Sequence, residues 1–420
     1  MHHVIIGAGP AGVVAAETLR KIDPGCRVTL VGDEPEPPYS RMAIPYLLVG
    51  NIAEPGSYLR KTTDHYARKE IGVLQDRVVS VDTQSKVLTL EKGRTLSYDK
   101  LLLACGSTPV RPPIAGIDLP GVVNCWTLDD ARAIIERAKA GSDVVLVGAG
   151  FIGCIILEAL AERGVNLTVL EMGDRMVPRM MNHAAGDMLK RWCESKGVTV
   201  HTDTRVERID DQGGRLVVSA SGGRTLPCDL VISAAGVKPN TDFLAGSGIQ
   251  IDQGVLVDDY LRTNLEDIYA AGDVAQGRDF STGQFSVQAI QPTAADHARV
   301  AAVNMAGGSL RHIGSINMNV LATLGLISTS FGLWDGVGGG DSVELSDSKN
   351  FRYIQLQFDG ERLVGATTLG MTDHVGVLRG LIQTRVELGV WKEKLRKDPM
   401  RLMEAYLATV QPIGYNARVA

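Results

Sequence analysis

The 420-residue chain lacks the features that mark several classes of protein. It has no Cys-x-x-Cys pair, a distribution that fits reduced thiols better than a disulfide framework or a zinc site. No apolar run reaches the roughly 18 residues that span a bilayer. A net charge of −5 leaves no basic excess, which argues against nucleic acid or an anionic membrane as the main partner. The six cysteines are Cys26, Cys105, Cys125, Cys154, Cys193 and Cys228.

What the chain does contain is typical of a globular protein. Apolar residues make up 45% of it and charged residues 22%. Its length is too great for one ordinary core, so two or three domains are expected. An expected strand begins by Val4, which leaves no room for a signal peptide and predicts a cytoplasmic protein.

Two copies of one glycine motif organise the chain. The apolar run from His3 to Ile6 leads into Gly7-Ala8-Gly9-Pro10-Ala11-Gly12 and an expected helix. The run from Asp143 to Val147 leads into Gly148-Ala149-Gly150-Phe151-Ile152-Gly153 and another expected helix. In such a motif the first glycine makes a tight turn, the second lets the backbone approach a pyrophosphate, and the third lets the helix pack on the strand. One such motif is a weak signal, but two in the right context indicate two dinucleotide sites.

Acidic residues follow the next expected strand in each copy. Asp33 and Glu34 come after the strand from Arg27 to Val31, where a ribose is usually bound, and Asp33, nearer the strand, is the better candidate. The alternative is a solvated turn. Glu171 ends the second such strand, where a carboxylate accepts hydrogen bonds from ribose hydroxyls and repels a 2′-phosphate, which predicts NADH over NADPH.

Basic residues leave alternatives open at both sites. Arg175 and Arg179 lie just beyond Glu171 and could instead bind a 2′-phosphate. Arg41 lies in the proline-rich segment 35–48, before an expected short helix. It could pair with cofactor phosphates or lie on the surface.

Short strands separated by polar turns complete each unit. In the first, expected strands at 79–81, 86–90 and 100–103 end in the small residues Ala104-Cys105-Gly106-Ser107-Thr108-Pro109, which can face a cofactor. In the second, strands at 215–219 and 228–233 end in the similar segment 234–240. Two similar units in series form an internal repeat.

Two later segments return to the first site. In 269–273, small residues allow close approach of a ligand, and Asp273 can accept hydrogen bonds from a polyol. A helix expected over 291–302 has Pro292 in its first turn, and its positive end could stabilise an anion. From about Ile316 onward, a strand over 351–358, a hairpin turn at Asp359-Gly360, a strand over 362–369 and helices at 374–388 and 399–409 indicate a smaller α+β domain.

Together these motifs resemble the two-dinucleotide-binding-domain flavoproteins, the class I pyridine nucleotide-disulphide oxidoreductase superfamily, over essentially the whole chain. The segment 32–41 looks like that of NAD(P)H:ferredoxin and rubredoxin reductases and of the flavin module of NADH-dependent nitrite reductase. The resemblance implies an α/β fold with two Rossmann-like domains containing inserted β-meanders, and a C-terminal α+β interface domain. The implied domains are an FAD-binding domain at 1–112 and 241–315, an NAD(H)-binding domain at 113–240, and a dimerisation domain at 316–420.

The resemblance and the motifs give two sets of cofactor residues and no metal site. The flavin supplies the chemistry, so no catalytic side chain is expected, although Phe151 lies where relatives place a gate beside the nicotinamide. The helix from Gln291 would stabilise negative charge on the reduced flavin. The FAD set is Gly7, Gly9, Pro10, Ala11, Gly12, Asp33, Glu34, Arg41, Ala104, Gly106, Asp273, Pro292 and Thr293. The NAD set is Gly148, Gly150, Phe151, Ile152, Gly153, Glu171 and Gly236.

The chain also departs from its relatives. Residues 38–50 hold no cysteine where disulphide reductases, peroxidases and many NADH oxidases carry a redox thiol. Tyr46 and Ile155 stand where ferredoxin-reductase relatives have a lysine and a glutamate, which leaves the region near the flavin less charged. Cys105 and Cys154 are expected to be small buried thiols.

The predicted activity is transfer of electrons from NADH through FAD to a carrier such as ferredoxin or rubredoxin, by a cytoplasmic homodimer. A basic cluster could bind an acidic carrier or could be a solvated helix end. One alternative is an NADH oxidase that uses oxygen or a small oxidant. Another is a redox-responsive binding protein similar to apoptosis-inducing factor. The basic cluster is Lys392, Lys394, Arg396 and Lys397.

Overall fold

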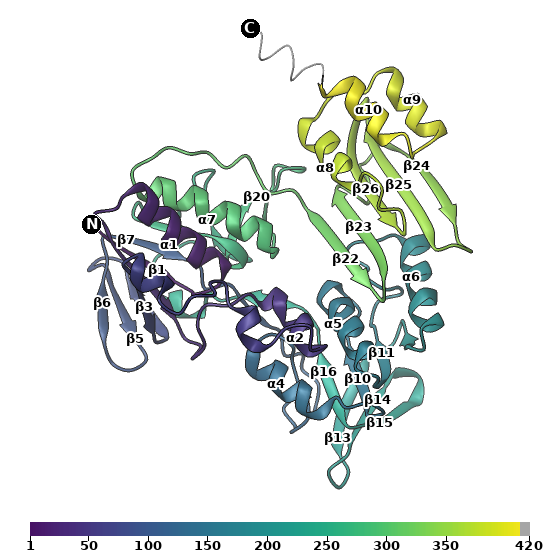
Figure 1. Ribbon diagram of the computed structural model, residues 1–420, viewed down its shortest axis with the longest axis horizontal. Coiled ribbons are helices and arrows are strands. Elements are labelled where there is room, and N and C mark those ends of the chain that lie inside the picture. Colours follow the sequence, from purple (N-terminus) through teal and green to yellow (C-terminus); the bar gives the residue numbers. More distant parts are fainter. Residues whose placement is uncertain (412–420) are drawn as a thin grey trace. The chain divides into compact units, whose positions relative to one another are not determined.

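The computed structural model describes residues 1–411, which form two compact units (Figure 1). The first unit combines Met1–Val110 with Val237–Ser315, and the second combines Arg111–Gly236 with the chain from Ile316 onward. Each unit is therefore built from two separate stretches of sequence. The segments predicted to bind NAD and to form the C-terminal domain lie within one unit, and their separation into two domains stays a prediction.

A parallel five-stranded sheet forms the centre of the first unit, in the order β19-β7-β1-β2-β3. Because helices or strands cover both of its faces, its strands are continuous apolar runs, with Val4 and Ile5 fully buried. The fifth strand, β3, was not expected from the sequence. The strands are β1 (His2–Ile6), β2 (Arg27–Gly32), β3 (Ile71–Gln75), β7 (Lys100–Leu103) and β19 (Ile268–Ala270).

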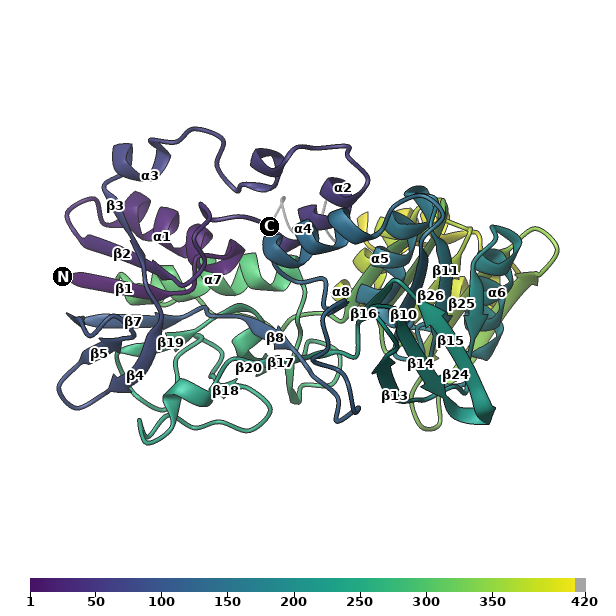
Figure 2. The ribbon, with the colours of Figure 1, turned by 90° about the horizontal axis from the view of Figure 1, so that it is seen from below.

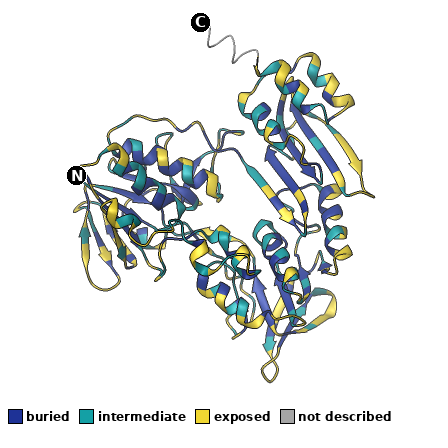
Figure 3. Ribbon diagram, in the orientation of Figure 1, coloured by how far each residue is buried: buried dark blue, intermediate teal, exposed yellow. Residues whose placement is uncertain are grey.

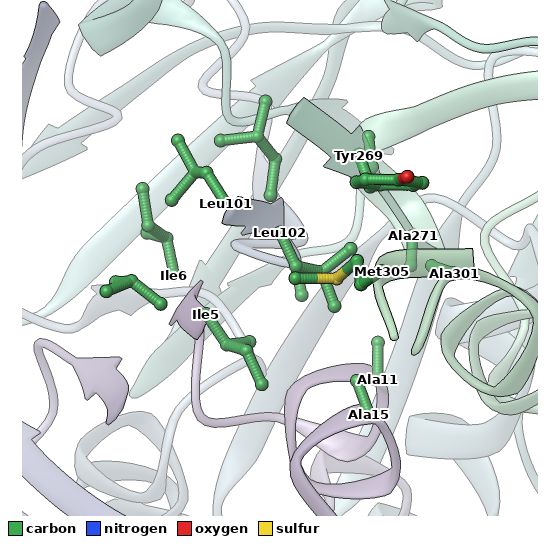
Figure 4. Close-up of a cluster of buried hydrophobic side chains, with 14 of the residues drawn as sticks. Ile5, Ile6, Ala11, Ala15, Leu101, Leu102, Tyr269, Ala271, Ala301 and Met305 are labelled. Atoms are coloured by element: carbon green, nitrogen blue, oxygen red, sulfur yellow. The ribbon is translucent and has the colours of Figure 1, made fainter. Parts of the chain in front are cut away.

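Two helices, α1 (Pro10–Ile22) and α7 (Gln291–Met305), lie side by side on one face of this sheet (Figures 1 and 2). Small buried side chains, Ala11 and Ala15 on α1 and Ala301 on α7, lie in the core cluster of Figure 4. Small side chains allow two helices to approach closely. The sequence expectation of a helix from Gln291 is confirmed, and the helix extends three residues further.

The first unit also contains smaller sheets and short helices. The expected meander is present in part, as the antiparallel sheet β4-β5-β6, whose residues Leu88 and Leu90 belong to the same buried core. The third strand of this sheet is β6, which was not expected, and the strand expected at 100–103 is instead β7 of the parallel sheet. The strands are β4 (Val78–Asp82), β5 (Val87–Leu90), β6 (Thr95–Ser97), β8 (Ser107–Pro109), β17 (Val237–Pro239), β18 (Val255–Leu256), β20 (Ala275–Arg278) and β21 (Phe285–Val287). The short helices are η1 (Arg41–Ala43), α2 (Ile44–Leu48), η2 (Glu54–Ser57), α3 (His65–Arg68), η4 (Asp242–Leu244) and η5 (Gly272–Val274).

The second unit repeats this design in its parallel sheet β12-β11-β10-β16-β9. The glycine loop again follows a central strand, β10 (Asp143–Val147), and leads into α5 (Phe151–Glu162). Figure 3 shows the central strands of the sheet as buried. The remaining elements are β9 (Val122–Val123), α4 (Leu128–Arg137), β11 (Asn166–Leu170), α6 (His183–Ser195), β12 (Thr199–His201) and β16 (Leu230–Ser233).

The prediction of one strand over 228–233 is wrong, because these residues belong to two different strands. The antiparallel sheet β13-β14-β15 ends at Cys228, and the parallel strand β16 begins at Leu230. Between them, the Asp229 carboxylate accepts a 2.8 Å hydrogen bond from the backbone N–H of Asp143, where the chain passes from one sheet to the other. The smaller elements here are β13 (Val206–Asp211), β14 (Leu216–Ala220), η3 (Ser221–Gly223) and β15 (Arg224–Cys228).

The C-terminal part of the second unit is an antiparallel sheet in the order β22-β23-β26-β25-β24, with three helices. The expected helix over 374–388 ends early, at Arg385, which has a left-handed φ of +52°. The hairpin turn is Gly360-Glu361, one residue later than expected, because Asp359 still pairs with Arg362. The elements are β22 (Met318–Thr323), β23 (Leu326–Gly332), β24 (Asp341–Asp347), β25 (Arg352–Asp359), β26 (Arg362–Leu369), α8 (Val375–Thr384), α9 (Val390–Lys397) and α10 (Leu402–Thr409).

Because α7 carries a buried histidine, we predict that the free energy of unfolding falls in acid. Burial, with the adjacent His312 ring, lowers the pKa of His297 to about 3. The unfolded chain binds this proton below pH ~6.5 while the folded chain does not, so stability falls as pH drops from about 6.5 to about 3. Urea titrations across this pH range measure the free energy of unfolding. His297→Gln should reduce the slope of that free energy against pH by up to ~1.4 kcal/mol per pH unit. The exposed control His183→Gln should leave the slope unchanged, and an unchanged slope in His297→Gln would contradict the assignment.

Candidate dinucleotide sites

The first glycine loop joins β1 to α1, and two of its glycines are required by the chain's own packing. Gly7 has a φ of +113°, and a Cβ there would lie 2.1 Å from the carbonyl oxygen of Ala104. A Cβ on Gly12 would lie 1.9 Å from the carbonyl oxygen of Gly7. Both distances are impossible contacts, so these positions admit no side chain.

The middle glycine of this loop is different. A Cβ on Gly9 would meet no heavy atom within 4 Å, and the φ of −79° is ordinary. Gly9 is also the N-cap of α1, and no side chain caps that helix. Unpartnered N–H groups beside open space suit a phosphate, because they add to the positive end of the helix dipole. The loop therefore fits the pyrophosphate of a dinucleotide.

A carboxylate lies in the same unit at the start of η5. The Ser107 hydroxyl donates a 2.8 Å hydrogen bond to Asp273 Oδ2. Burial raises the pKa of Asp273, and the Ser107 hydrogen bond and the positive charge of Arg41 act against that rise. Ser107 follows β7 at the start of β8 and is a site residue that sequence patterns alone do not select. It holds the carboxylate that the sequence selected.

The N-terminus of α7 lies in the same unit as the first glycine loop. Its N-cap, Ile290, provides no side-chain cap, and Thr293 in its first turn is buried while Pro292 is exposed. The Ser40 hydroxyl donates a 2.9 Å hydrogen bond to Gln291 Oε1, which ties the proline-rich segment to this helix end. By contrast α4 and α6 are capped by Thr127 and Asn182.

The acidic pair after β2 already has protein partners. Asp33 forms a 3.1 Å ion pair with Arg77. Glu34 forms a 2.6 Å ion pair with Arg41 and accepts a hydrogen bond from the Tyr39 hydroxyl. Arg77 was missed because β3, the strand that brings it to this sheet edge, was not expected.

The second glycine loop has the same construction. Gly148 has a φ of +103°, and a Cβ there would lie 2.6 Å from the Ala234 carbonyl oxygen. A Cβ on Gly153 would lie 2.1 Å from the Gly148 carbonyl oxygen, whereas one on Gly150 would meet nothing within 4 Å. No side chain caps α5, which begins with the partly buried Phe151 and Ile152. Gly236, at the end of the unit, is exposed with a φ of +104°.

Glu171 braces this second loop. Its side chain is buried directly after β11 (Asn166–Leu170), and its two oxygens accept hydrogen bonds from the backbone N–H groups of Ala149 at 2.6 Å and Gly173 at 2.7 Å. Within residues 1–411 it forms no ion pair. The Arg175 guanidinium donates to the Met181 carbonyl oxygen at 2.8 Å, so it is engaged in its own loop. The geometry favours ribose hydroxyls over a 2′-phosphate at Glu171.

The thiols beside the two loops are protonated. Cys105 Sγ donates to the carbonyl oxygen of Asn240, and Cys154 Sγ donates to that of Ala149. Burial raises the pKa of Cys105 to about 12 and raises the pKa of Cys154 well above its ordinary value. All six cysteines lie among the described residues, and each is a free thiol. Both groups are therefore poor nucleophiles.

The glycine geometry predicts opposite effects for two substitutions in the first loop. Gly9→Ala should leave the stability of the folded chain within about 0.5 kcal/mol of wild type but lower its flavin content, because the added methyl group enters the open space. Gly12→Ala should destabilise the fold by about 1–3 kcal/mol or more, because backbone must move. Thermal unfolding and flavin absorbance of the purified proteins measure the two effects. Full flavin binding by Gly9→Ala would exclude close contact of a phosphate at that residue.

Comparisons with known proteins agree with this geometry. Residues 1–301 match the family model described as pyridine nucleotide-disulphide oxidoreductase. The chain is 31% identical over 403 residues to the epsilon subunit of an NADH-dependent phenylglyoxylate dehydrogenase of Aromatoleum evansii, covering 95% of each protein. It is 30% identical over 404 residues to the ferredoxin–NAD(+) reductase component of a biphenyl dioxygenase system of Paraburkholderia xenovorans, covering 91% of this chain and 93% of the relative.

A solved structure shares the fold. The ferredoxin reductase of a Rhodopseudomonas palustris system superposes with a TM-score of 0.83 at 26% identity, covering 90% of this chain and 93% of that one. Among the helices of residues 1–411, none is both long and apolar enough to cross a membrane.

The match to the family model and the identities with these relatives show that the chain belongs to the pyridine nucleotide-disulphide oxidoreductase family. The ferredoxin–NAD(+) reductase members of this family use FAD and NADH, the two cofactors predicted from the sequence.

Proposed function

We propose that this protein oxidises NADH and passes the electrons through bound FAD to a ferredoxin-type carrier. The observation that carries the proposal is the pair of glycine loops, each with an open middle glycine at an uncapped helix end. The names of two relatives, a ferredoxin–NAD(+) reductase component and a ferredoxin reductase, support the choice of acceptor.

The first loop is assigned to FAD. Gly9 and the N–H groups of α1 would bind its pyrophosphate, and Asp33 or Glu34 would accept hydrogen bonds from its ribose. Asp273, held by Ser107, would accept hydrogen bonds from its ribitol hydroxyls. The positive end of α7 would stabilise negative charge that develops on the ring system. When bound, FAD accepts a hydride and releases electrons one at a time, a chemistry that protein side chains do not supply.

The second loop is assigned to NADH. Gly150 and the N-terminus of α5 would bind the pyrophosphate, and Glu171 would accept hydrogen bonds from the adenosine ribose. Phe151 and Ile152 lie at the start of α5, beside the path of the bound dinucleotide, where an aromatic ring can act as a gate. Gly236 ends the stretch Arg111–Gly236, and a Cβ there would meet no heavy atom within 4 Å.

The two sites differ in how the sequence completes them. The first draws on Gly7, Ala104, Asp273 and Gln291, which come from the two separate stretches of sequence that make up the first unit. The second draws on residues from Gly148 to Gly236, all of which lie in the single stretch Arg111–Gly236. A site assembled from many segments suits a resident cofactor, and a local one suits a substrate that binds and leaves.

The basic cluster at 392–397 contributes little to the proposal. Lys392 lies within 3.4 Å of Asp341, and Arg396 lies within 3.4 Å of both Asp341 and Glu393. These ion pairs neutralise half of the cluster, which favours a solvated helix end over a docking site for an acidic carrier. A homodimer formed through the C-terminal domain and a cytoplasmic location stay predictions.

Rates of reoxidation test the proposed acceptor. The NADH-reduced protein is mixed in a stopped-flow instrument with a [2Fe–2S] ferredoxin, with rubredoxin or with oxygen. We expect the ferredoxin to reoxidise it at least about tenfold faster than oxygen does, a difference of about 1.4 kcal/mol in activation free energy. Faster reaction with oxygen would identify an NADH oxidase. Slow reaction with every acceptor would favour a redox-responsive binding protein.

From the position of Glu171 we predict that the protein prefers NADH to NADPH. The wild-type kcat/KM should favour NADH over NADPH, and Glu171→Gln should narrow that ratio by about tenfold or more, because a neutral amide no longer repels a 2′-phosphate. Arg179→Gln tests the alternative that this exposed side chain binds a 2′-phosphate, and it should leave the ratio unchanged if Glu171 sets the preference. A wild-type preference for NADPH, or a change of the ratio in Arg179→Gln but not in Glu171→Gln, would refute the role of Glu171.

A further inference from the structure

Three metal-ligating side chains meet in the first unit, away from both glycine loops. A nitrogen of His3, a carboxylate oxygen of Asp23 and the sulfur of Cys26 all lie within 4.8 Å of one another. His3 is near the start of β1, Asp23 caps the C-terminal end of α1, and Cys26 directly precedes β2. In the sequence His3 lies 20 or more positions before the other two, and Asp23 and Cys26 are three positions apart. The β1–α1–β2 unit brings all three together.

The environment of His3 needs an explanation. Its side chain is fully buried, yet neither ring nitrogen has a hydrogen-bond partner among residues 1–411. A buried polar atom without a partner costs free energy, and native proteins contain few of them. Cys26 is also buried, while Asp23 is partly exposed beside the exposed turn Pro24-Gly25. Two unsatisfied ring nitrogens thus belong to a side chain that lies next to a thiol and a carboxylate.

The protonation states suit a cation. Burial, together with the positive charge of Lys100, lowers the pKa of His3 to about 4, so the imidazole is neutral and keeps a free lone pair at neutral pH. Burial and the charge of Asp23 raise the pKa of Cys26, so its thiol is protonated until a metal displaces the proton. The nearby Arg20 guanidinium donates to the backbone carbonyl oxygens of Pro24 and Cys26, and so is held by the backbone around the cluster.

We propose that His3, Asp23 and Cys26 bind a zinc ion. One nitrogen, one sulfur and one carboxylate oxygen form a ligand set that zinc accepts, with water in the fourth tetrahedral position. A thiolate and a carboxylate together balance the charge of a divalent cation. Zinc–ligand bonds of about 2.0–2.3 Å require the three atoms to lie closer together than their present upper limit of 4.8 Å, so the side chains would close around a bound ion.

The proposed ion has a structural role. It would clamp β1, the end of α1 and the start of β2 at the amino-terminal end of these two strands, whereas the first glycine loop follows the carboxyl end of β1. The 13 residues of α1 separate the two ends by about 20 Å, so the ion is too far from that loop to take part in flavin chemistry. This inference does not depend on the proposed function.

Zinc uptake by the untagged, flavin-containing protein tests the site. After removal of metals with a chelator and dialysis, the protein is titrated with zinc chloride and the bound metal is measured by mass spectrometry. We expect uptake of one zinc per chain and a rise in thermal stability. Cys26→Ala should abolish both, whereas the control Cys228→Ala, which removes another buried thiol, should retain both.

A second variant covers the case in which Cys26→Ala fails to fold. Asp23→Asn changes a partly exposed turn residue and should weaken zinc binding by about tenfold or more while leaving flavin absorbance unchanged. Cobalt substitution should also produce ligand-field bands at wavelengths longer than those of the flavin. Absence of zinc uptake by the wild-type protein, or equal affinity in the wild type and Asp23→Asn, would overturn the proposal.

Discussion

The close approach of backbone to backbone at the glycine loops is the constraint on which both sites depend. Gly7 lies against Ala104 and Gly12 against Gly7, at distances that leave no space for a Cβ. The same contacts recur between Gly148 and Ala234 and between Gly153 and Gly148. They fix the angle at which each helix leaves its strand. The helix N-terminus therefore faces open space at the middle glycine, and its N–H groups are left for a ligand to satisfy.

Two loops of the same construction need not bind equivalent ligands. The first loop is surrounded by elements from distant parts of the chain, since β19 joins the sheet about 260 residues after β1 and α7 packs directly on α1. Ordering so many segments around one ligand couples its binding to the stability of the unit. The second loop is braced locally by the Glu171 carboxylate. Its ligand can leave without disturbing the core, as the turnover of a substrate requires.

Much of this arrangement follows from local patterns in the sequence, and the remainder depends on tertiary contacts. The two parallel sheets and the helices after each glycine loop could be predicted, because apolar runs followed by Gly-x-Gly-x-x-Gly have few structural solutions. The pairing of Arg77 with Asp33 could not, because it depends on β3, a strand with the exposed residue Val73 and a weak apolar pattern. Cys228 similarly looked like the start of β16, since periodicity cannot show where a chain changes sheets.

Two carboxylates that the sequence selected, Glu171 and Asp273, share a property that sequence patterns cannot reveal. Each accepts hydrogen bonds from neutral donors, Glu171 from two backbone N–H groups and Asp273 from the Ser107 hydroxyl, and Arg41 acts on Asp273 only through its charge. Neutral donors orient a carboxylate without cancelling its charge, so it keeps its capacity to accept further hydrogen bonds. By contrast, Asp33 and Glu34 are each paired with an arginine. A ribose or ribitol hydroxyl gains more from a carboxylate whose charge is not already matched, which makes Glu171 and Asp273 the stronger candidates for contact with the cofactors.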